Sequence, residues 1–177
     1  INSQAKLISK WMGVGFIHGV MNTDNTTICG ETIDYGPCAF MDHYDPKKVF
    51  SYIDFGGRYS FMNQGKIMLW NLSKFAESII PLLSDNIEDA KKIAIECLKE
   101  FPEIFEKNWL KEMRRKIGLT SIQNEDIKII NDFLELIKNE NLDFTLSFRN
   151  LSNLINSNSK KKEENNFKDK NNFNEWF

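Results

Sequence analysis

Cysteine, histidine and proline are scarce in this sequence. Its 177 residues include 3 cysteines, 2 histidines and 4 prolines. The cysteines, Cys29, Cys38 and Cys97, are an odd number and form no CxxC pair, which argues against a disulfide framework and against a zinc knuckle. A zinc set drawn from His18, His43 and two of these cysteines matches no familiar ligand spacing. We therefore expect a chain that works in a reducing compartment without structural zinc.

An excess of one charge and a long apolar run are also missing. Lys and Arg number 23 against 25 Asp and Glu, a net charge of -2, so nothing global attracts nucleic acid or an acidic membrane. The longest apolar runs are far shorter than the roughly 18 to 20 residues that cross a bilayer, and no basic, apolar leader opens the sequence. We expect an intracellular protein of the bacterial cytoplasm or the mitochondrion, with no nucleic-acid partner and no membrane partner.

Most of the sequence has the spacing of apolar residues that is typical of helices. We expect helices at about residues 4–14, 66–80, 87–98, 103–116, 124–137 and 142–155. Pro102 falls between two of these stretches, which leaves a helical hairpin or a kinked helix, and Gly118 should end the second one. Trp70 and its apolar neighbours are expected in the core.

The region between the first two helices has a different pattern. Residues 26–29 and 32–34 contain β-branched side chains and are separated by Gly30-Glu31, which is typical of a short β-hairpin between two loops. The predicted fold is therefore mainly α, with one small hairpin.

The end of the sequence differs in composition from the rest. Residues 1–155 have a globular composition, and we assign them to one domain. Residues 156–174 are dominated by Asn, Ser, Lys and Glu, so they offer little apolar surface to offset the entropy of ordering. We expect a flexible insertion there, with residues 175–177 as the start of a following, truncated segment.

The candidate chemistry lies between the first two helices. Asn25 follows His18 at the spacing of the kinase motif H-R-D-x-x-x-x-N, and Asp34-Tyr35-Gly36 stands where kinases have D-F-G. In kinases that Asn and that Asp hold magnesium on ATP. Amide and carboxylate oxygens suit Mg²⁺, and nucleotide phosphates complete its coordination. We therefore expect Asn25 and Asp34 to bind Mg²⁺, with Mn²⁺ as the alternative ion.

The usual kinase base is missing from this pattern. Gly19 and Val20 stand where the motif has Arg and Asp. Asp24 is the nearest carboxylate that could contact an incoming hydroxyl. His18 is expected to organise the loop rather than to react. We interpret the region as a kinase-like metal site with altered chemistry.

Several segments of the chain closely resemble one family, the SelO/YdiU (selenoprotein O) protein adenylyltransferases. They are WMGVGFIHGVMNTDN (Trp11 to Asn25), DYGP (Asp34 to Pro37), Phe40 to Asp42, GRYSF (Gly57 to Phe61), Asn63-Gln64 and Trp70 to Leu72. The resemblance is strong over residues 5–83 and looser over 84–155, where DFTLSFRNLS looks like a further family segment.

The resemblance implies a pseudokinase that binds ATP and transfers AMP, rather than the γ-phosphoryl group, to Ser, Thr or Tyr hydroxyls of proteins, with release of pyrophosphate. By the same resemblance, Asp24 would be the proton acceptor. Asn25 and Asp34 would hold magnesium, and Asp34 would also contact the nucleotide.

The resemblance also implies which part of that fold this chain forms. It would be the mainly helical C-terminal lobe of a protein-kinase-like domain, with the short hairpin carrying the metal ligands. The family's N-terminal lobe, with further nucleotide-binding residues, would precede Ile1. The isolated chain is then expected to be inactive and to leave apolar residues near Ile28, Ile33 and Phe40 exposed.

Two other functions fit the same residues. Because Val20 replaces the kinase base, the chain could be a catalytically inactive pseudokinase remnant that acts as a binding module. It could also be an atypical protein kinase that uses Asp24. Arg58 has two open roles: it binds a phosphate or a substrate carboxylate, or it ties its segment to the core.

Overall fold

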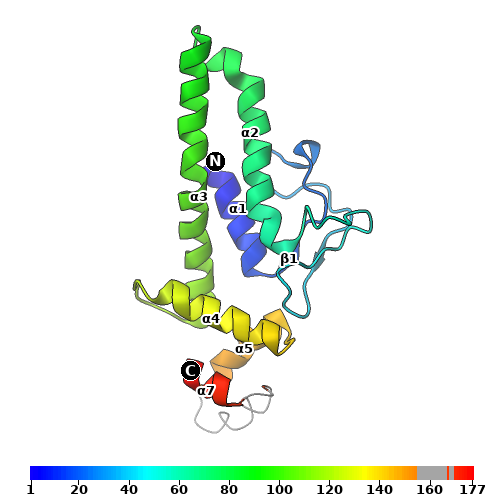
Figure 1. Ribbon diagram of the computed structural model, residues 1–177, viewed down its shortest axis with the longest axis vertical. Coiled ribbons are helices and arrows are strands. Elements are labelled where there is room, and N and C mark those ends of the chain that lie inside the picture. Colours follow the sequence, from blue (N-terminus) through cyan, green and yellow to red (C-terminus); the bar gives the residue numbers. More distant parts are fainter. Residues whose placement is uncertain (155–166, 168–169) are drawn as a thin grey trace.

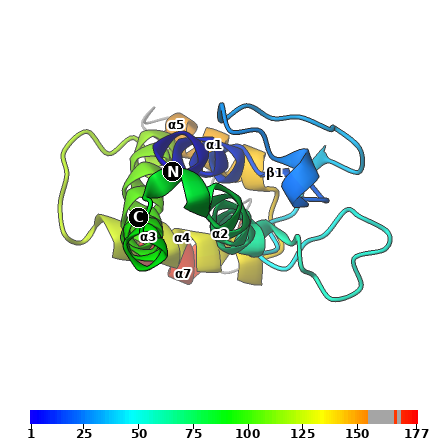
Figure 2. The same ribbon diagram turned by 90° about the horizontal axis from the view of Figure 1, so that it is seen from above.

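The computed structural model describes residues 1–154, 167 and 170–177. Helix α1 (Asn2–Gly13) lies between two longer antiparallel helices, α2 (Gln64–Leu83) and α3 (Ile87–Ile117), and packs against both (Figures 1 and 2). The shorter helices α4 (Asp126–Asn139), α5 (Phe144–Leu154) and α7 (Lys170–Trp176) lie at the lower end of α3. The prediction of a mainly helical fold is confirmed.

The core forms where α1 packs against its neighbours. Ala5 and Ile8 are fully buried and Met12 is nearly so, because this spacing places all three on one face of the helix. Burial of each large side chain contributes about 1.5–3 kcal/mol to folding, so α1 holds the two long helices together.

Helix α3 runs without interruption through Pro102, which excludes the helical hairpin and leaves the other alternative, a single helix through the proline. Proline lacks an N–H group and removes one bond of the helix ladder. Packing compensates at this point, since Phe101 is 2% exposed and its ring stacks on Phe105 with centroids 5.9 Å apart. The helix ends where predicted: Gly118 has φ 88°, in the left-handed region that favours glycine.

The small sheet is not where the sequence predicts it. Strand β1 (Phe16–Ile17) pairs antiparallel with β2 (Ala39–Phe40), with Phe16 opposite Phe40. Residues 26–29 and 32–34 form no strands, so the predicted hairpin is wrong. The strand pair instead closes the base of one long loop, residues 18–38.

This loop is held by side chains of α1 rather than by a strand ladder. Gln4 donates a hydrogen bond to the carbonyl oxygen of Thr27, and Trp11 Nε1 donates to Thr32 Oγ1 over 2.9 Å. The bond from Gln4 takes up a backbone carbonyl that a hairpin could pair across its own strands, and the bond from Trp11 fixes the Thr32 side chain, so the loop is held to α1 in place of a strand ladder.

The C-terminal end adds a small aromatic cluster on α4. Phe167 and Phe173 are buried and their rings stack with centroids 4.2 Å apart, and Trp176 Nε1 donates to the carbonyl oxygen of Ile129 over 3.0 Å. Most of the predicted flexible insertion, residues 156–174, lies outside the described residues. Its described end is helical in α7 and packs against α4.

A charged pair fixes α4 to the end of α3. Asp126 accepts a hydrogen bond from the backbone N–H of Gln123 over 3.0 Å and forms an ion pair with Arg114. The backbone N–H of Gln123 is the main cause of a lowered pKa at Asp126, and Arg114 lowers the pKa further. The folded state therefore holds the charged carboxylate more strongly than the unfolded chain does.

We expect the Asp126 pair to make folding sensitive to acid. A carboxyl whose pKa is lowered on folding stabilises the protein above its unfolded pKa of about 3.9, and that stabilisation is lost as the pH falls through the folded pKa. Urea midpoints measured from neutral pH down into this range should fall less steeply for Asp126→Asn than for the wild type. Asp132→Asn, which removes the exposed partner of Lys128, is the control. If the urea midpoints of the wild type and of Asp126→Asn fell equally with pH, the assignment of a lowered pKa to Asp126 would be contradicted.

Candidate active site

Asp24 and Asn25 lie on the 3-10 turn η1 (Thr23–Asn25). Asn25 Nδ2 donates to the carbonyl oxygen of Val20 over 3.1 Å. A carbonyl only accepts, so the nitrogen faces Val20 and the Asn25 Oδ1 oxygen remains available for a ligand. The Asp24 side chain is exposed and makes no hydrogen bond within the part of the chain that the structure describes. The turn therefore presents one carboxylate and one amide oxygen.

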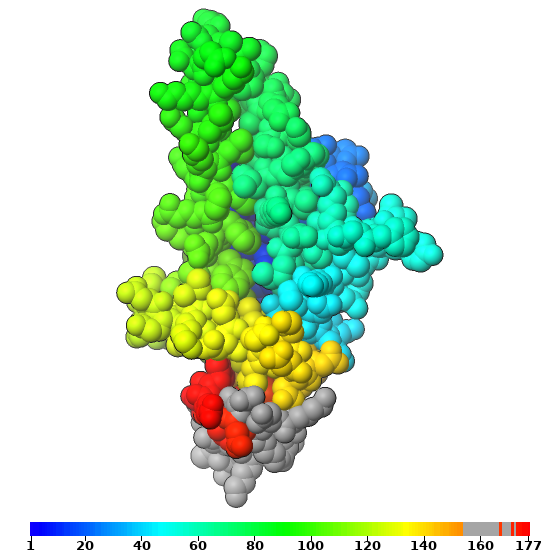
Figure 3. Space-filling view, in the orientation of Figure 1, coloured from blue at the N-terminus to red at the C-terminus, as the bar shows by residue number. Residues whose placement is uncertain are grey.

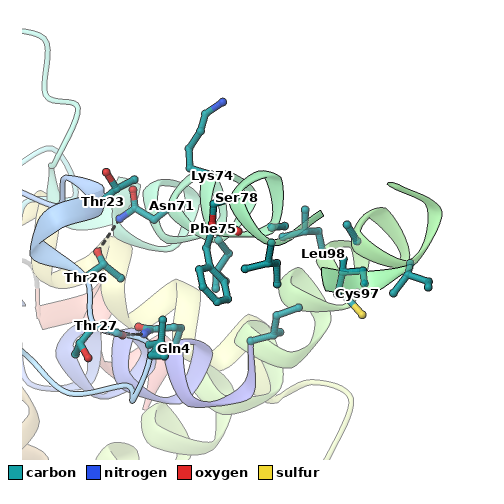
Figure 4. A pocket seen from close by; sticks show the side chains of 18 residues that line it. Gln4, Thr23, Thr26, Thr27, Asn71, Lys74, Phe75, Ser78, Cys97 and Leu98 are labelled. Atoms are coloured by element: carbon teal, nitrogen blue, oxygen red, sulfur yellow. Dashed lines mark hydrogen bonds between the residues drawn. The ribbon is translucent and has the colours of Figure 1, made fainter. Parts of the chain in front are cut away.

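Asn71 of α2 anchors this turn through two hydrogen bonds of its side chain. It is 4% exposed, and its Nδ2 donates to the carbonyl oxygen of Met21 over 3.1 Å and to Thr26 Oγ1 over 2.8 Å. The two acceptors flank η1, so a single buried amide holds both ends of the turn that carries Asp24. Figure 4 shows the bond from Asn71 to Thr26. Sequence reasoning missed Asn71. The available signal was a polar residue on the buried side of an apolar helix.

We expect Asn71→Ala to loosen the turn. The change removes two hydrogen bonds and leaves the buried Met21 carbonyl without its partner, which should cost about 1–3 kcal/mol of folding free energy. Hydrogen exchange at the Asn25 backbone amide, which donates to the Asn22 carbonyl oxygen, should become faster. Asn131→Ala on the exposed side of α4 is the control and should change stability by no more than about 0.5 kcal/mol. Unchanged exchange at Asn25 would show that Asn71 does not fix the turn.

Asp34 lies farther along the same loop in an unusual backbone conformation. Its φ is 54°, in the left-handed region, where Asp and Asn are the most tolerant residues after glycine. The Asp34 carbonyl oxygen accepts a hydrogen bond from the Gly36 N–H over 2.9 Å, which closes a tight turn. The carboxylate itself is exposed and, among the described residues, has no hydrogen-bond partner. It is thus available to a ligand from the solvent.

His18 holds the Asp34 segment in place, as the sequence predicts. It is 1% exposed, and its Nε2 lies 2.8 Å from the carbonyl oxygen of Ile33. The carbonyl can only accept, so we assign the proton to Nε2. The His18 backbone N–H donates to Oε1 of Gln64, the first residue of α2, over 3.1 Å. His18 therefore organises the loop and is too buried to meet a substrate.

Glycine is required where the loop passes close to itself. Gly19 has φ 87°, and a Cβ atom added there would lie 2.9 Å from the Pro37 carbonyl oxygen. Any other residue would push the segment after Asp34 away from the segment before Asp24.

Asn25 and Asp34 each carry a side-chain oxygen of the kind that a hard cation binds. Both residues are on the 18–38 loop and neither oxygen set is used by another described side chain. No group of three or more His, Cys, Asp and Glu suited to a metal occurs in the described part of the chain. A Mg²⁺ ion held here would therefore take few protein ligands and complete its shell with phosphate or water oxygens, which is its usual behaviour at nucleotide sites.

Trp70 is not in the core, so that prediction is wrong. Its side chain is 42% exposed, and the Arg58 guanidinium lies over the ring, 4.8 Å from its centroid. Lys74 approaches the same ring at 5.7 Å. Stacking of cations on the ring explains how a large aromatic side chain of α2 remains at the surface.

An apolar pocket of about 520 Å³ lies next to the η1 turn, between α1, α2 and α3 (Figure 4). Its walls include Phe75, Ile79 and Leu98, and Lys74 is its one charged lining residue. A nucleotide polyphosphate would find little charge compensation there, so the pocket does not extend the Asp24, Asn25 and Asp34 site toward phosphate.

Three apolar residues of this region are exposed, as expected. Ile28, Ile33 and Phe40 are 76%, 37% and 64% exposed.

None of the helices that the structure describes combines the length and the apolar character needed to cross a bilayer.

Known proteins match most of this chain. A profile of the family described as protein adenylyltransferase SelO matches residues 1–177. A protein nucleotidyltransferase YdiU of Halalkalibacterium halodurans is 51% identical over 176 residues, which is 99% of this chain and 35% of that protein. Another with this name, from Clostridium botulinum (strain Eklund 17B), is 55% identical over 152 residues, 86% of this chain and 31% of that protein.

A third similar protein, also named protein nucleotidyltransferase YdiU, comes from Rhizobium meliloti and is 54% identical over 149 residues. The chain spans about a third of the length of these curated relatives. Since the family profile covers all 177 residues and the identities exceed half, the chain belongs to the SelO family.

Proposed function

We propose that the protein containing these residues is a nucleotidyltransferase that transfers AMP from ATP to Ser, Thr or Tyr hydroxyls of other proteins. The observation that carries the proposal is the set of Asp24, Asn25 and Asp34 on one anchored loop, with both carboxylates exposed and Asn25 half-buried, in a chain whose relatives are named protein nucleotidyltransferases. The proposal includes a protein-kinase-like C-terminal lobe for residues 1–155.

In the proposed reaction the acceptor hydroxyl oxygen attacks the α-phosphorus of ATP. A new O–P bond forms, the bond from the α-phosphorus to the bridging oxygen breaks, and pyrophosphate leaves. Asp24 accepts the hydroxyl proton, because its carboxylate is exposed on η1 and free of other described hydrogen bonds. Asn71 keeps the turn in position through its bonds to Met21 and Thr26.

Asn25 Oδ1 and the Asp34 carboxylate are the residues that would hold Mg²⁺ with the nucleotide. The ion supplies charge neutralisation for the phosphates and helps to orient them. The chain itself holds the two residues in place through other atoms, so that their ligand oxygens are not taken up by hydrogen bonds within the described residues. Asn25 is fixed through Val20, and Asp34 is fixed through the bond from His18 to the preceding carbonyl.

Separate labels on the α and γ phosphates of ATP test the proposal in the full-length protein. Transfer of AMP places the α label on a protein acceptor and leaves the γ label in pyrophosphate. Transfer of the γ label would instead support the atypical kinase. Absence of both labels from every acceptor, with ATP still bound, would support an inactive binding module and overturn the proposal.

A further inference from the structure

The segment between β2 and η2 (Phe61–Asn63) exposes unusually large apolar side chains. Tyr52, Ile53 and Phe55 are 91%, 74% and 89% exposed, and the rings of Tyr52 and Phe55 contact each other with centroids 6.3 Å apart. In Figure 3 this segment projects from the body of the molecule. We call residues 47–58 the projecting loop. Apolar groups gathered on such a feature are typical of a surface that contacts another protein.

The base of the projecting loop is fixed. The two carboxylate oxygens of Asp54 accept hydrogen bonds from the backbone N–H groups of Arg58 and Tyr59, each over 2.8 Å. Asn63 Nδ2 donates to the carbonyl oxygen of Gly57 over 2.9 Å. The backbone at Arg58 is therefore held by the loop's own hydrogen bonds, and the Arg58 side chain is not needed for that purpose.

The Arg58 guanidinium is positioned and unpaired. It lies 4.8 Å from the ring centroid of Trp70 and 5.6 Å from that of Tyr59. Among the described residues it forms no ion pair, and neither do Lys47 and Lys48 of the same loop. Stacking limits the rotamers of Arg58 while its N–H groups stay open, an arrangement suited to a planar carboxylate.

The same two aromatic residues connect Arg58 to the candidate active site. Tyr59 donates its hydroxyl hydrogen to Asn22 Oδ1, and Asn22 is the residue that precedes η1. Trp70 is followed by Asn71, which holds Met21 and Thr26 on either side of that turn. Arg58 therefore stacks on one residue, Tyr59, that bonds to the residue before this turn, and on another, Trp70, whose neighbour Asn71 anchors the turn.

We propose that the projecting loop binds an acidic segment of the acceptor protein, with Arg58 binding a carboxylate on that segment. Tyr52 and Phe55 pack against apolar side chains of the same segment. This inference rests on the proposed function for the identity of the partner as an acceptor. A polypeptide is favoured over the phosphates of ATP because exposed apolar side chains next to Arg58 suit a polypeptide, whereas the proposed place of the phosphates is on the Mg²⁺ ion that Asn25 and Asp34 would hold.

Peptide binding to the full-length protein tests the inference without requiring catalysis. The probe is a fluorescein-labelled peptide with one serine among glutamate and leucine residues, and its matched peptide has glutamine for glutamate. Fluorescence anisotropy should show that Arg58→Gln weakens binding of the acidic peptide by at least about fivefold and leaves the weaker binding of the glutamine peptide unchanged. Arg58→Lys should retain part of the affinity.

The control variant is Arg149→Gln on α5, which removes the same charge from an exposed position outside the projecting loop. It should bind the acidic peptide like the wild type. Equal affinity of Arg58→Gln and wild type for the acidic peptide would overturn the proposal. Equal affinity of the wild type for the acidic and glutamine peptides would also overturn it.

The KM values for peptide and for ATP show whether Arg58 binds the peptide or the phosphates of ATP. With α-labelled ATP, Arg58→Gln should raise KM for the acidic peptide and leave KM for ATP unchanged. A raised KM for ATP with an unchanged peptide KM would assign Arg58 to the nucleotide and overturn the proposal. If the wild type labels no acceptor, neither peptide nor protein, while ATP still binds, the proposed function fails, and the anisotropy measurements still decide whether Arg58 binds the acidic segment.

Discussion

Replacing Asp34 with Asn should reduce magnesium-dependent nucleotidyl transfer by at least about a hundredfold while the protein stays folded. The substitution removes the one charged ligand of the proposed metal pair. Asparagine accepts the left-handed conformation at φ 54° as readily as aspartate does, so no backbone strain accompanies the loss of charge. The carboxylate has no described partner, so the thermal midpoint should remain close to that of the wild type.

The measurement is a magnesium titration of α-label transfer by the full-length protein, paired with a thermal melt. Asp34→Asn should need more magnesium to reach its lower maximum rate. Asp85→Asn, an exposed aspartate in the turn between α2 and α3, removes the same charge elsewhere and should behave like the wild type. Normal turnover at low magnesium in Asp34→Asn would exclude Asp34 as the essential metal ligand.

Helices α1 to α5 were predictable because each depends on local signals. The apolar spacing of α1 and α4 is regular, and glycine at position 118 supplies a left-handed end to α3. Pro102 left a hairpin and a single kinked helix open, because a proline removes one hydrogen bond but does not reveal how much packing the rest of the helix gains. Here the burial of Phe101 and its neighbours outweighs that loss.

The path of the 18–38 loop was not predictable from its own residues. Its polar groups bond to Gln4 and Trp11 on α1 and to Asn71 on α2, all distant in sequence. Local β-branched residues favour strands only when no better partner for the backbone is present. The motif around Asn25 and Asp34 indicates the candidate ligands, but the residues that orient them became visible only in the fold.

Asp24→Asn should lower kcat for AMP transfer by about 10²–10⁴-fold, the usual contribution of a general base. Asparagine has nearly the same shape and cannot accept the proton in the same way. The Asp24 side chain is exposed and makes no described hydrogen bond, so stability and ATP binding should change little. Glu31→Gln, at another exposed carboxylate of the same loop, is the matched control and should retain normal kcat.

Comparing a serine acceptor with a tyrosine acceptor distinguishes a general base from a residue that only shapes the turn. A tyrosine hydroxyl has a pKa of about 10 and gives up its proton far more readily than a serine hydroxyl does. Loss of the base should therefore harm transfer to a serine peptide more than transfer to a tyrosine peptide of the same flanking sequence. A structural defect at η1 would misplace both acceptors and lower both rates equally. Equal losses for the two peptides in Asp24→Asn would therefore remove Asp24 from the role of proton acceptor, whereas a larger serine defect is the result that proton transfer to Asp24 requires.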